Sequence, residues 1–468
     1  MFLWQQHAQS DAFKHKIALR DFSQGEVFTW RQLAERIDEV AVRLKAQGIN
    51  ADSAIALCGK NSFALLCHYL AALQSGARVM GINPAFAESK IAELCEVYRI
   101  DHCIYFEPQT GGIATVKNSQ FRHRTFSPAA PLHSCTLTLT SGSTGLPKAA
   151  VHGMAAHIAN AEGVCKLMRF TAADSWLLTL PLYHVSGQGI VWRWLLQGAE
   201  LHLPAADFYR SAAQSSHLSL VPTQLQRFLG YLRQNPLDSL RTRHILLGGS
   251  HIPVNLTQTA QHYGVQTYSG YGMTEMGSTV FAKASDDSDG VGQPLKGREY
   301  RLVNDEIWLR GAGLAAGYWR DGEIHPLTNA EGWLQTKDKG CWNGNELVIL
   351  GRLDNMFISG GENIQPEEIE CLLQQHESVR QAFVLPKADA EFGWRPVAFI
   401  RFSDPDFQSA VLKLRVWLSD KIEKFKQPVG YFPLDEEKWR RQGTIKISRK
   451  LLQNELTFLL GKQTNVGN

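Results

Sequence analysis

The sequence predicts an α/β fold in which a large N-terminal domain is followed by a small α+β domain. The first observation is alternation, because apolar strand-like segments at 54–57 and 78–82 alternate with helical segments at 30–44 and 63–74. Such alternation is typical of parallel or mixed sheets flanked by helices. The second is length, since 468 residues exceed what one hydrophobic core supports. The third is a change of character after about residue 290, where short strands separated by Gly, Asn and Asp indicate an antiparallel β subdomain.

The elements of the first half follow from the spacing of apolar residues. Leu33, Ile37, Val40 and Leu44 recur at helical spacing within 30–44. Further strands are expected at 136–140, 176–180, 218–221, 244–247 and 266–268. Polar or glycine-rich segments follow these strands, and in open α/β sheets ligands bind at the carboxyl ends of strands. The sequence therefore predicts a ligand site in this half.

The C-terminal part is predicted as a separate unit. Strands are expected at 306–310 and 346–350, followed by a boundary at 351–355. Beyond the boundary we expect two helices and two strands, at 366–375, 381–385, 396–402 and 409–425. We therefore divide the chain into domains 1–353 and 354–468.

Composition argues against several classes of protein. The net charge of +3 gives no reason to expect nucleic-acid binding. The eight cysteines show no C-x-x-C spacing, so zinc ribbons are not expected and the thiols are interpreted as buried, in a reducing compartment. The most apolar segment, at 63–73, is shorter than the roughly twenty residues that span a bilayer. We expect a cytoplasmic protein with no signal peptide and no membrane partner.

The stretch 138–148 joins a β-branched strand to a loop that ends at Lys148. Gly142 and Gly145 allow backbone N–H groups to turn toward an anion, and the hydroxyls of the loop add donors. It is not a Walker A loop, because Pro147 precedes the lysine and alanine follows it. The loop predicts a cradle for a polyphosphate, with a flexible surface turn as the alternative.

A second motif, Tyr-Gly-Met-Thr-Glu at 271–275, is expected directly after a strand. Tyr271 is suited to stack on a purine, and Gly272 would let a flat base approach. Glu275 offers a hard carboxylate oxygen for Mg²⁺. The alternative is a tight turn with an exposed glutamate.

The two motifs, in this order, resemble the signatures of the AMP-forming adenylate-forming superfamily, which includes acyl-CoA synthetases, firefly luciferase and peptide-synthetase adenylation domains. The resemblance extends over 28–449. It implies a two-step ligase: a carboxylate attacks the α-phosphate of ATP to give an acyl-adenylate and pyrophosphate, and the thiol of coenzyme A then takes the acyl group and releases AMP. Mg²⁺ bound with ATP would be the cofactor, and coenzyme A a co-substrate.

The resemblance also implies roles for particular residues in nucleotide binding. Asp338 and Arg352 would contact the ribose, although Lys337 stands where the superfamily usually has glycine. Thr144 and Glu275 would hold the metal. The full set implied for ATP comprises Thr140, Ser141, Gly142, Ser143, Thr144, Gly145, Lys148, Gly270, Tyr271, Gly272, Thr274, Asp338 and Arg352.

Further implied roles concern catalysis and domain movement. Lys446 would be the adenylating lysine, in a Lys-x-x-Arg spacing with Ile445 replacing the usual glycine. His184 and Glu275 complete the implied catalytic set. Asp354 matches the hinge of a mobile C-terminal domain, and Gly360 and Gly361 match the edge of the coenzyme A tunnel. Taken alone, an isolated histidine is structural more often than functional.

Three segments, 185–195, 220–225 and 361–366, look like those of the o-succinylbenzoate–CoA ligases of menaquinone (vitamin K2) biosynthesis. Their substrate, 2-succinylbenzoate, carries a second carboxylate that a cation would pair, and Arg193 and Arg227 are the candidates; a surface ion pair is the alternative for either. The implied acyl pocket comprises His184, Ser186, Gly187, Gln188, Arg193, Thr223, Arg227, Gly248 and Gly249.

Other functions remain as alternatives at this stage. The acid could be another aromatic or medium-chain carboxylic acid. A peptide-synthetase module is disfavoured because no carrier domain follows. A nucleotide-binding regulatory protein that has lost catalysis should lack Lys446 or Glu275, and both are present. The oligomeric state is left open, with a homo-oligomer as one alternative.

Overall fold

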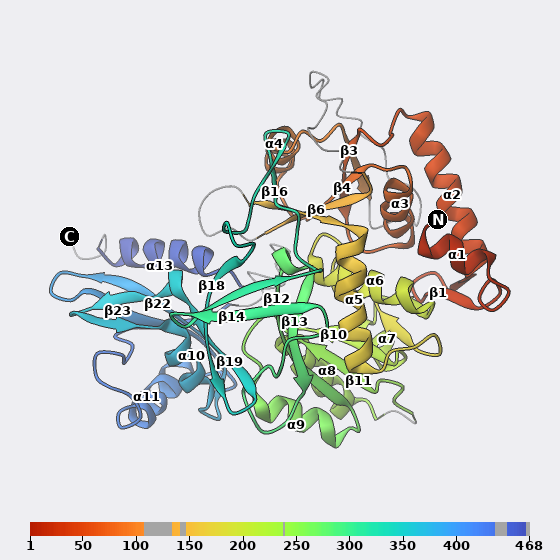
Figure 1. Ribbon diagram of the computed structural model, residues 1–468. Helices are drawn as coiled ribbons and strands as arrows, with labels where there is room; N and C mark the ends of the chain where they lie inside the picture. The colour runs from red at the N-terminus through yellow and green to blue at the C-terminus, as the bar shows by residue number, and fades with distance from the viewer. Residues whose placement is uncertain (107–132, 141–146, 237–238, 436–446, 465–468) are drawn as a thin grey trace. The chain divides into compact units, whose positions relative to one another are not determined.

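The computed structural model of the protein describes residues 1–106, 133–140, 147–236, 239–435 and 447–464 (Figure 1). The chain forms two compact units. One comprises Met1–Tyr300 with Leu309–Leu334, and the other comprises Arg301–Trp308 with Gln335–Asn468.

Two large mixed sheets organise the first unit. The eight-stranded sheet has the order β13-β12-β11-β10-β8-β9-β1-β2, and the seven-stranded sheet has the order β17-β16-β7-β6-β4-β3-β5. The strands of the eight-stranded sheet are β1 (Ile17–Asp21), β2 (Glu26–Thr29), β8 (Ser175–Leu177), β9 (Glu200–Leu203), β10 (His217–Leu220), β11 (His244–Leu247), β12 (Gln266–Met273) and β13 (Ser278–Ala284). Those of the seven-stranded sheet are β3 (Ala54–Gly59), β4 (Arg78–Ile82), β5 (His102–Phe106), β6 (Cys135–Leu139), β7 (Ala149–Gly153), β16 (Tyr318–Arg320) and β17 (Glu323–His325).

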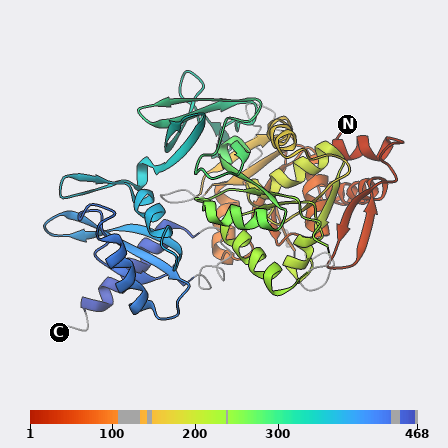
Figure 2. The same ribbon diagram turned by 90° about the horizontal axis from the view of Figure 1, so that it is seen from below.

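Helices cover both sheets. They are α1 (Leu3–Gln9), α2 (Trp30–Ala46), α3 (Phe63–Gln74), α4 (Glu88–Val97), α5 (Met154–Met168), α6 (Val185–Gln197), α7 (Phe208–Ala213), α8 (Pro222–Gln234) and α9 (Val254–His262). Helix α2 begins at a reciprocal cap, because the side chains of Thr29 and Gln32 each bond the other residue's backbone N–H. Helices α8 and α9, in the green part of the chain in Figure 2, share a core with β10 and β11 that includes Leu225, Phe228 and Ala260.

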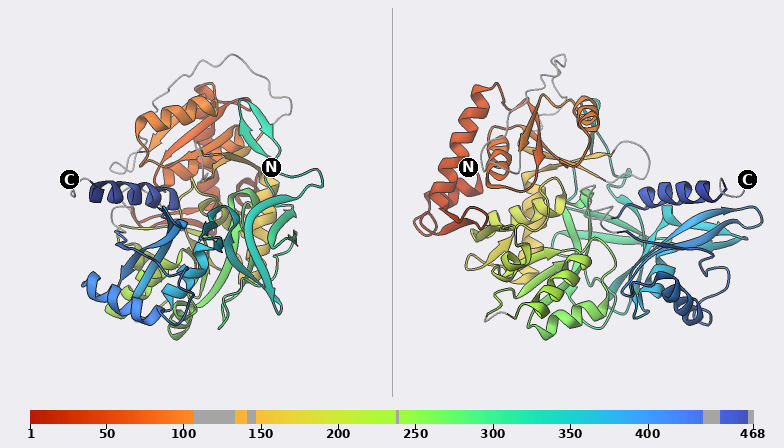
Figure 3. Two further views of the ribbon diagram at one scale, coloured as in Figure 1. Left: turned by 90° about the vertical axis from the view of Figure 1, so that its left-hand side faces the viewer. Right: turned by 180° about the vertical axis from the view of Figure 1, so that it is seen from behind.

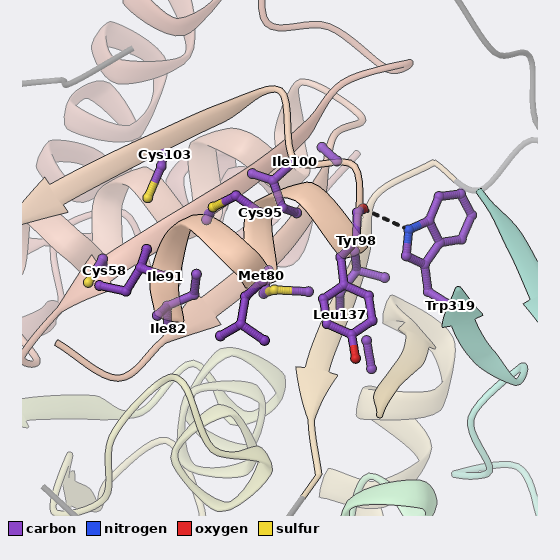
Figure 4. Packing of buried hydrophobic residues seen from close by; sticks show 14 of the residues in the cluster. Cys58, Met80, Ile82, Ile91, Cys95, Tyr98, Ile100, Cys103, Leu137 and Trp319 are labelled. Atoms are coloured by element: carbon purple, nitrogen blue, oxygen red, sulfur yellow. Dashed lines mark hydrogen bonds between the residues drawn. The ribbon is translucent and has the colours of Figure 1, made fainter. Parts of the chain in front are cut away.

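The core of the seven-stranded sheet lies between β3, β4, β6 and helix α4. Figure 4 shows Met80 and Ile82 near Ile91 of that helix, and Leu137 beside Tyr98, all in one buried cluster. Trp319 of β16 closes this core and is 3% exposed. The short strand β16 is therefore fixed by burial as well as by pairing.

The next strands form a four-stranded sheet of order β14-β15-β18-β19, in which β18 and β19 pair antiparallel, as expected for this part of the chain. Its strands are β14 (Arg298–Val303), β15 (Glu306–Gly311), β18 (Leu334–Asn343) and β19 (Glu346–Arg352). The 3₁₀ turn η2 (Leu353–Asn355) comes next, at the predicted boundary.

The remaining residues build a five-stranded sheet with helices on both faces. Its strands are β20 (Phe357–Ser359), β21 (Glu362–Ile364), β22 (Val379–Asp389), β23 (Gly393–Phe402) and β24 (Tyr431–Pro433). Helices α10 (Pro366–Gln374) and α11 (Phe407–Leu418) share one core with β22 and β23, and α13 (Arg449–Thr464) shares another. Figures 1 and 3 show α13 along the face of this sheet opposite to α10 and α11.

Most expected elements are confirmed, but several bounds were wrong. The strand predicted at 381–385, for example, extends from Val379 to Asp389. The helix predicted at 409–425 ends at Leu418, where Ser419 caps it and a turn follows. The strand predicted at 176–180 ends at Leu177. The strand predicted at 266–268 continues through Met273, because β13 pairs with its second half.

Two expectations from composition can be compared with the fold. Across the described parts of the chain, no helix reaches the length and apolarity that a bilayer crossing requires. All eight cysteines are free thiols, and six of them are buried as expected. Cys341 is exposed and Cys371 is partly exposed, so the expectation was wrong for these two.

Candidate active site

The predicted phosphate loop is closed by a strand pair. Strands β6 and β7 run antiparallel with Leu139 opposite Ala149, and the Thr140 N–H donates to the Lys148 carbonyl at 2.8 Å. This pairing brings the two ends of the loop together and fixes where the loop starts and stops. The loop residues themselves, Ser141, Gly142, Ser143, Thr144 and Gly145, lie outside the described residues.

One side chain joins the two predicted ATP motifs. The Lys148 ammonium lies 4.7 Å from the centroid of the Tyr318 ring, and the Tyr318 hydroxyl donates to Glu275 Oε1 at 2.8 Å. The structure therefore brings Lys148 and Glu275 to the same tyrosine. Sequence reasoning did not select Tyr318, whose only local signal is its place in a Gly-Tyr-Trp step.

The Tyr-Gly-Met-Thr-Glu motif spans the end of β12 and the 3₁₀ turn η1 (Thr274–Met276). A Cβ on Gly272 would lie 2.0 Å from the Ser278 carbonyl oxygen, so close approach of the β13 backbone requires glycine there. Close packing against β13 therefore explains why position 272 requires glycine, independently of the predicted approach of a base. Tyr271 and Thr274 are partly exposed, as is Glu275, whose carbonyl accepts from the Ala315 N–H at 2.8 Å.

Several predicted residues gather at the carboxyl edge of the eight-stranded sheet. In the parallel strands β10, β11 and β12, Leu220 pairs with Leu247, and Leu247 pairs with Ser269. The segments that follow these partners therefore share one edge. They contain Thr223 and Arg227 of α8, Gly248, Gly249, Gly270 and Tyr271.

The start of helix α6 supplies further predicted residues. His184 is its N-cap residue and makes no side-chain capping bond; its ring lies 4.8 Å from the Tyr183 ring. His184 therefore directly precedes helix α6. Ser186, in the first turn, is partly exposed.

Gly187 and Gln188 are held by packing. A Cβ on Gly187 would lie 2.1 Å from the Pro181 carbonyl oxygen. The Gln188 amide accepts from the Thr138 hydroxyl at 3.2 Å and donates to the Leu182 carbonyl at 3.1 Å. Gln188 thereby ties α6 to the strand that enters the phosphate loop.

Arg193 lies in the C-terminal half of helix α6, and its side chain is buried, with the residue 1% exposed. Its Nη1 is 3.4 Å from the Ser219 hydroxyl, and its guanidinium carbon lies 5.1 Å from the Trp176 ring centroid. Within the described residues its Nε and Nη2 have no hydrogen-bond partner. Burial lowers the pKa of Arg193 to about 10, so the group stays charged at neutral pH. A buried charge with unpaired donors is costly in free energy, and a bound anion would offset that cost.

In the second unit, Asp338 and Arg352 form a side-chain pair. They are opposite each other in the β18–β19 ladder, and Arg352 Nη1 donates to Asp338 Oδ1 at 3.0 Å. Arg352 Nε also donates to Asp354 Oδ1 at 3.0 Å. Burial alone would raise the pKa of Asp354, but the hydrogen bond and charge of Arg352 outweigh it and the pKa is lowered. Three of the predicted residues are thus one connected group.

Gly360 and Gly361 form the two-residue turn between β20 and β21. Their φ angles are +58° and +91°, which L side chains rarely adopt. This turn is a β-hairpin that precedes helix α10, rather than a turn leading directly into the helix. Lys446 lies outside the described residues, but Arg449 is described and donates to Glu370 Oε1 at 2.6 Å at the start of α13.

Comparison with known proteins gives the family. The sequence profile described as "AMP-binding enzyme" matches residues 5–319. A Haemophilus influenzae protein named 2-succinylbenzoate–CoA ligase is 58% identical over 97% of this chain and 98% of its own. A Salmonella typhimurium protein of the same name is 45% identical over 92% of each chain.

Solved structures agree with the sequence relatives. An arginine-to-lysine variant of E. coli MenE with bound OSB-AMS has 40% identity and a TM-score of 0.84, covering 97% of this chain and 98% of that one. MenE from Bacillus subtilis in complex with ATP and magnesium has 24% identity and a TM-score of 0.77, covering 92% and 95%, which is a likeness of fold. The profile covers more than half of the chain and the relatives nearly all of it, so the chain belongs to the AMP-binding enzyme family.

Proposed function

We propose that this protein is an AMP-forming 2-succinylbenzoate–CoA ligase of menaquinone biosynthesis. It would convert 2-succinylbenzoate, ATP and coenzyme A into 2-succinylbenzoyl-CoA, AMP and pyrophosphate. Relatives that carry this name match nearly the whole chain at 58% and 45% identity. Part of the proposal is that the reaction takes place in the cytoplasm with small molecules as partners.

The single observation that carries the substrate class is the state of Arg193. Its charge is buried, and two of its donor nitrogens have no partner among the described residues. A carboxylate that is not consumed in the reaction would satisfy those donors through charge-assisted hydrogen bonds. A dicarboxylic acid supplies such a group, whereas a fatty acid does not. Arg227 is partly exposed, and we therefore favour Arg193.

The first half-reaction joins two anions. A carboxylate oxygen of the acid attacks the α-phosphorus of ATP, the bond to the β-phosphate bridge breaks, and pyrophosphate leaves. Lys148 and the donors of the loop would hold the phosphates, and Lys446 would stabilise the charge that grows in the transition state. His184, partly exposed at the start of α6, would lie beside the acyl group. In the second half-reaction the coenzyme A sulfur attacks the acyl carbon, loses its proton and expels AMP.

Glu275 suits a magnesium ion. Its carboxylate accepts a hydrogen bond from the neutral Tyr318 and forms no ion pair with any residue that the structure describes. Mg²⁺ prefers oxygen ligands, such as carboxylates, together with substrate phosphates. When bound with ATP, Mg²⁺ would neutralise phosphate charge, with Glu275 and Thr144 as its protein ligands.

Residues 354–468 would act as a mobile domain that presents Lys446 for the first half-reaction. After a rotation about Asp354, the same domain would present Gly360 and Gly361 to the pantetheine arm for the second half-reaction. The support is the Arg352–Asp354 pair, which connects the predicted hinge to β19, and the β20–β21 hairpin whose turn consists of the two glycines. Asp338 and Arg352 would hold the ribose.

Pyrophosphate release tests the proposal directly. The purified protein is given Mg²⁺, ATP, coenzyme A and one acid at a time: 2-succinylbenzoate, benzoate, 4-phenylbutyrate and octanoate. We expect 2-succinylbenzoate to give the highest kcat/KM, with formation of its thioester. A higher kcat/KM with any of the monocarboxylates would reject the dicarboxylate assignment.

A further inference from the structure

Strand β16 places two consecutive aromatic side chains on opposite faces. It pairs antiparallel with β7, with Tyr318 opposite Ala150 and Trp319 opposite Ala149, one residue after Lys148. Successive strand side chains point to opposite sides. The side chains of Tyr318 and Trp319 therefore contact two different parts of the structure.

Trp319 anchors the strand in the core. Its indole N–H donates to the Tyr98 carbonyl at 2.9 Å, as the dashed line in Figure 4 shows. The Tyr98 hydroxyl in turn donates to the carbonyl of Pro147, the residue before Lys148. These bonds fix β16 relative to the end of the phosphate loop.

Tyr318 makes two charged contacts that do not involve the Trp319 core. Its hydroxyl donates to Glu275 Oε1 at 2.8 Å, and the ammonium of Lys148 lies 4.7 Å from its ring centroid. Tyr318 is thus held in place by the anchored strand while it contacts both motifs.

The chemistry of a tyrosine suits this position. A phenol donates one hydrogen bond without neutralising the carboxylate, so the charge of Glu275 stays available to a cation; an arginine in the same place would cancel that charge. The ring face attracts the Lys148 ammonium without using its N–H donors, which stay available to phosphate oxygens. One neutral side chain therefore orients both charged groups and leaves both able to bind.

We propose that Tyr318 is a positioning residue for magnesium-bound ATP, which orients the Glu275 carboxylate through its hydroxyl and the Lys148 ammonium through its ring. This inference rests on the proposed function, in which Glu275 binds the metal and Lys148 the phosphates.

The test separates the hydroxyl from the ring. Tyr318→Phe keeps the ring and removes the donor, and Tyr318→Leu removes both. Binding of Mn²⁺ to the full-length protein, with α,β-methylene-ATP present, is measured by electron paramagnetic resonance, and pyrophosphate exchange is measured against free Mg²⁺. We expect Tyr318→Phe to weaken Mn²⁺ binding about 10-fold, the size usual for partners of metal ligands, and to shift the Mg²⁺ dependence equally. Tyr318→Leu should in addition raise the KM for ATP.

Two further variants make the result decisive. Trp319→Phe removes the bond to Tyr98 from the same strand but keeps the pairing of β16 with β7. It should lower the thermal midpoint and weaken Mn²⁺ binding much less than Tyr318→Phe does. Glu275→Gln tests the proposed metal ligand itself. If Glu275→Gln weakens Mn²⁺ binding and Tyr318→Phe does not, the role of Tyr318 is overturned while the proposed function stands. If Glu275→Gln has no effect, the proposed metal site fails first. If Trp319→Phe weakens Mn²⁺ binding as much as Tyr318→Phe, the effect belongs to the strand and the inference is rejected.

Discussion

Arg352 donates to Asp338 across the β18–β19 ladder at 3.0 Å, and the same guanidinium also bonds Asp354. One arginine therefore joins the residue predicted to hold the ribose to the residue predicted to be the hinge. Asp338 is 7% exposed, so its carboxylate is fixed by its surroundings rather than by solvent. Binding of the nucleotide and the state of the hinge are expected to influence each other through Arg352.

The first prediction concerns Asp338→Asn. The change keeps the shape of the side chain and removes the charge, so the bond from Arg352 and the proposed bonds from ribose hydroxyls lose their ionic character. Such bonds contribute about 1.5–3 kcal/mol, and we expect the KM for ATP to rise about 10- to 100-fold. Steady-state kinetics at saturating acid would measure it. Lys339→Met, which removes only a surface ion pair in the same strand, is the control and should change the KM little.

The second prediction concerns Lys337, which the superfamily usually replaces with glycine. Lys337 is exposed and has φ of +62°, a left-handed conformation that costs about 1–2 kcal/mol for a residue with a Cβ. Glycine removes that strain but loses about 0.5–1 kcal/mol to its freedom in the unfolded chain. We therefore expect Lys337→Gly to raise the free energy of unfolding by about 0.5–1 kcal/mol in urea titrations. Lys339→Gly, in extended backbone two residues on, should lower it instead.

The elements that the sequence predicted well are those whose ends are marked locally. Helix α3 has the predicted bounds because Ser62 caps its first turn and Gly76 follows its last. The second half of β12 was missed because glycines at 270 and 272 weaken the local preference for strand, and only the pairing with β13 restores it. Helix α11 was predicted too long because the apolar spacing continues past Ser419, where the helix ends.

The residues of the candidate site also divide into those with a local sequence signal and those that depend on distant parts of the chain. Lys148 and Glu275 belong to motifs and could be selected from the sequence alone. Tyr318 could not be selected in this way, because its contacts depend on the pairing of β16 with β7, more than 160 residues away. A local sequence pattern does not show which distant strands pair. The burial of Arg193 was likewise hidden, because α6 is buried on nearly all sides and has no polar face to mark an inward-pointing charge.

The third prediction separates the half-reactions. Lys446→Ala should slow formation of the acyl-adenylate about 100- to 1,000-fold, because the cation that we propose to stabilise transition-state charge is lost. Thioester formation from supplied acyl-adenylate should survive, since Lys446 would have left the site by then. Rapid-quench measurements of each half-reaction would show this, with the exposed Lys450→Ala as control. Equal loss in both half-reactions would contradict the movement of the domain.

The fourth prediction is that replacing Arg193 raises the stability of the fold but weakens binding of the acid substrate. Arg193→Met removes a buried charge and fills similar space, and replacing such a charge with an apolar residue is often stabilising by about 1–4 kcal/mol. We expect the thermal midpoint to rise while the KM for 2-succinylbenzoate rises at least 10-fold. Kinetics with benzoate should change little. A fall in thermal midpoint with an unchanged KM would show that Arg193 is a structural residue.

The last prediction concerns the stability of the fold at acidic pH. Burial lowers the pKa of His152 and of His217 to about 4, and that of His157 well below its ordinary value. In the unfolded chain these groups take up protons near pH 6.5, so between about pH 6.5 and pH 4 the unfolded state binds more protons than the folded state. Stability is therefore greatest above pH 6.5 and falls as the pH falls, by about 1.4 kcal/mol per histidine at pH 5.5.

Variants of His217 test that slope, because its ring stacks on His244 at 4.7 Å within an aromatic group that includes Trp176. His217→Phe keeps an aromatic ring at this place and removes the proton. We expect the loss of unfolding free energy between pH 7.0 and pH 5.5, measured by urea titration, to shrink by about 1.4 kcal/mol. His262→Gln changes an exposed histidine and should leave the slope as it is. An unchanged slope in His217→Phe would mean that His217 is already protonated in the folded chain at pH 5.5, and that its burial does not exclude the charge.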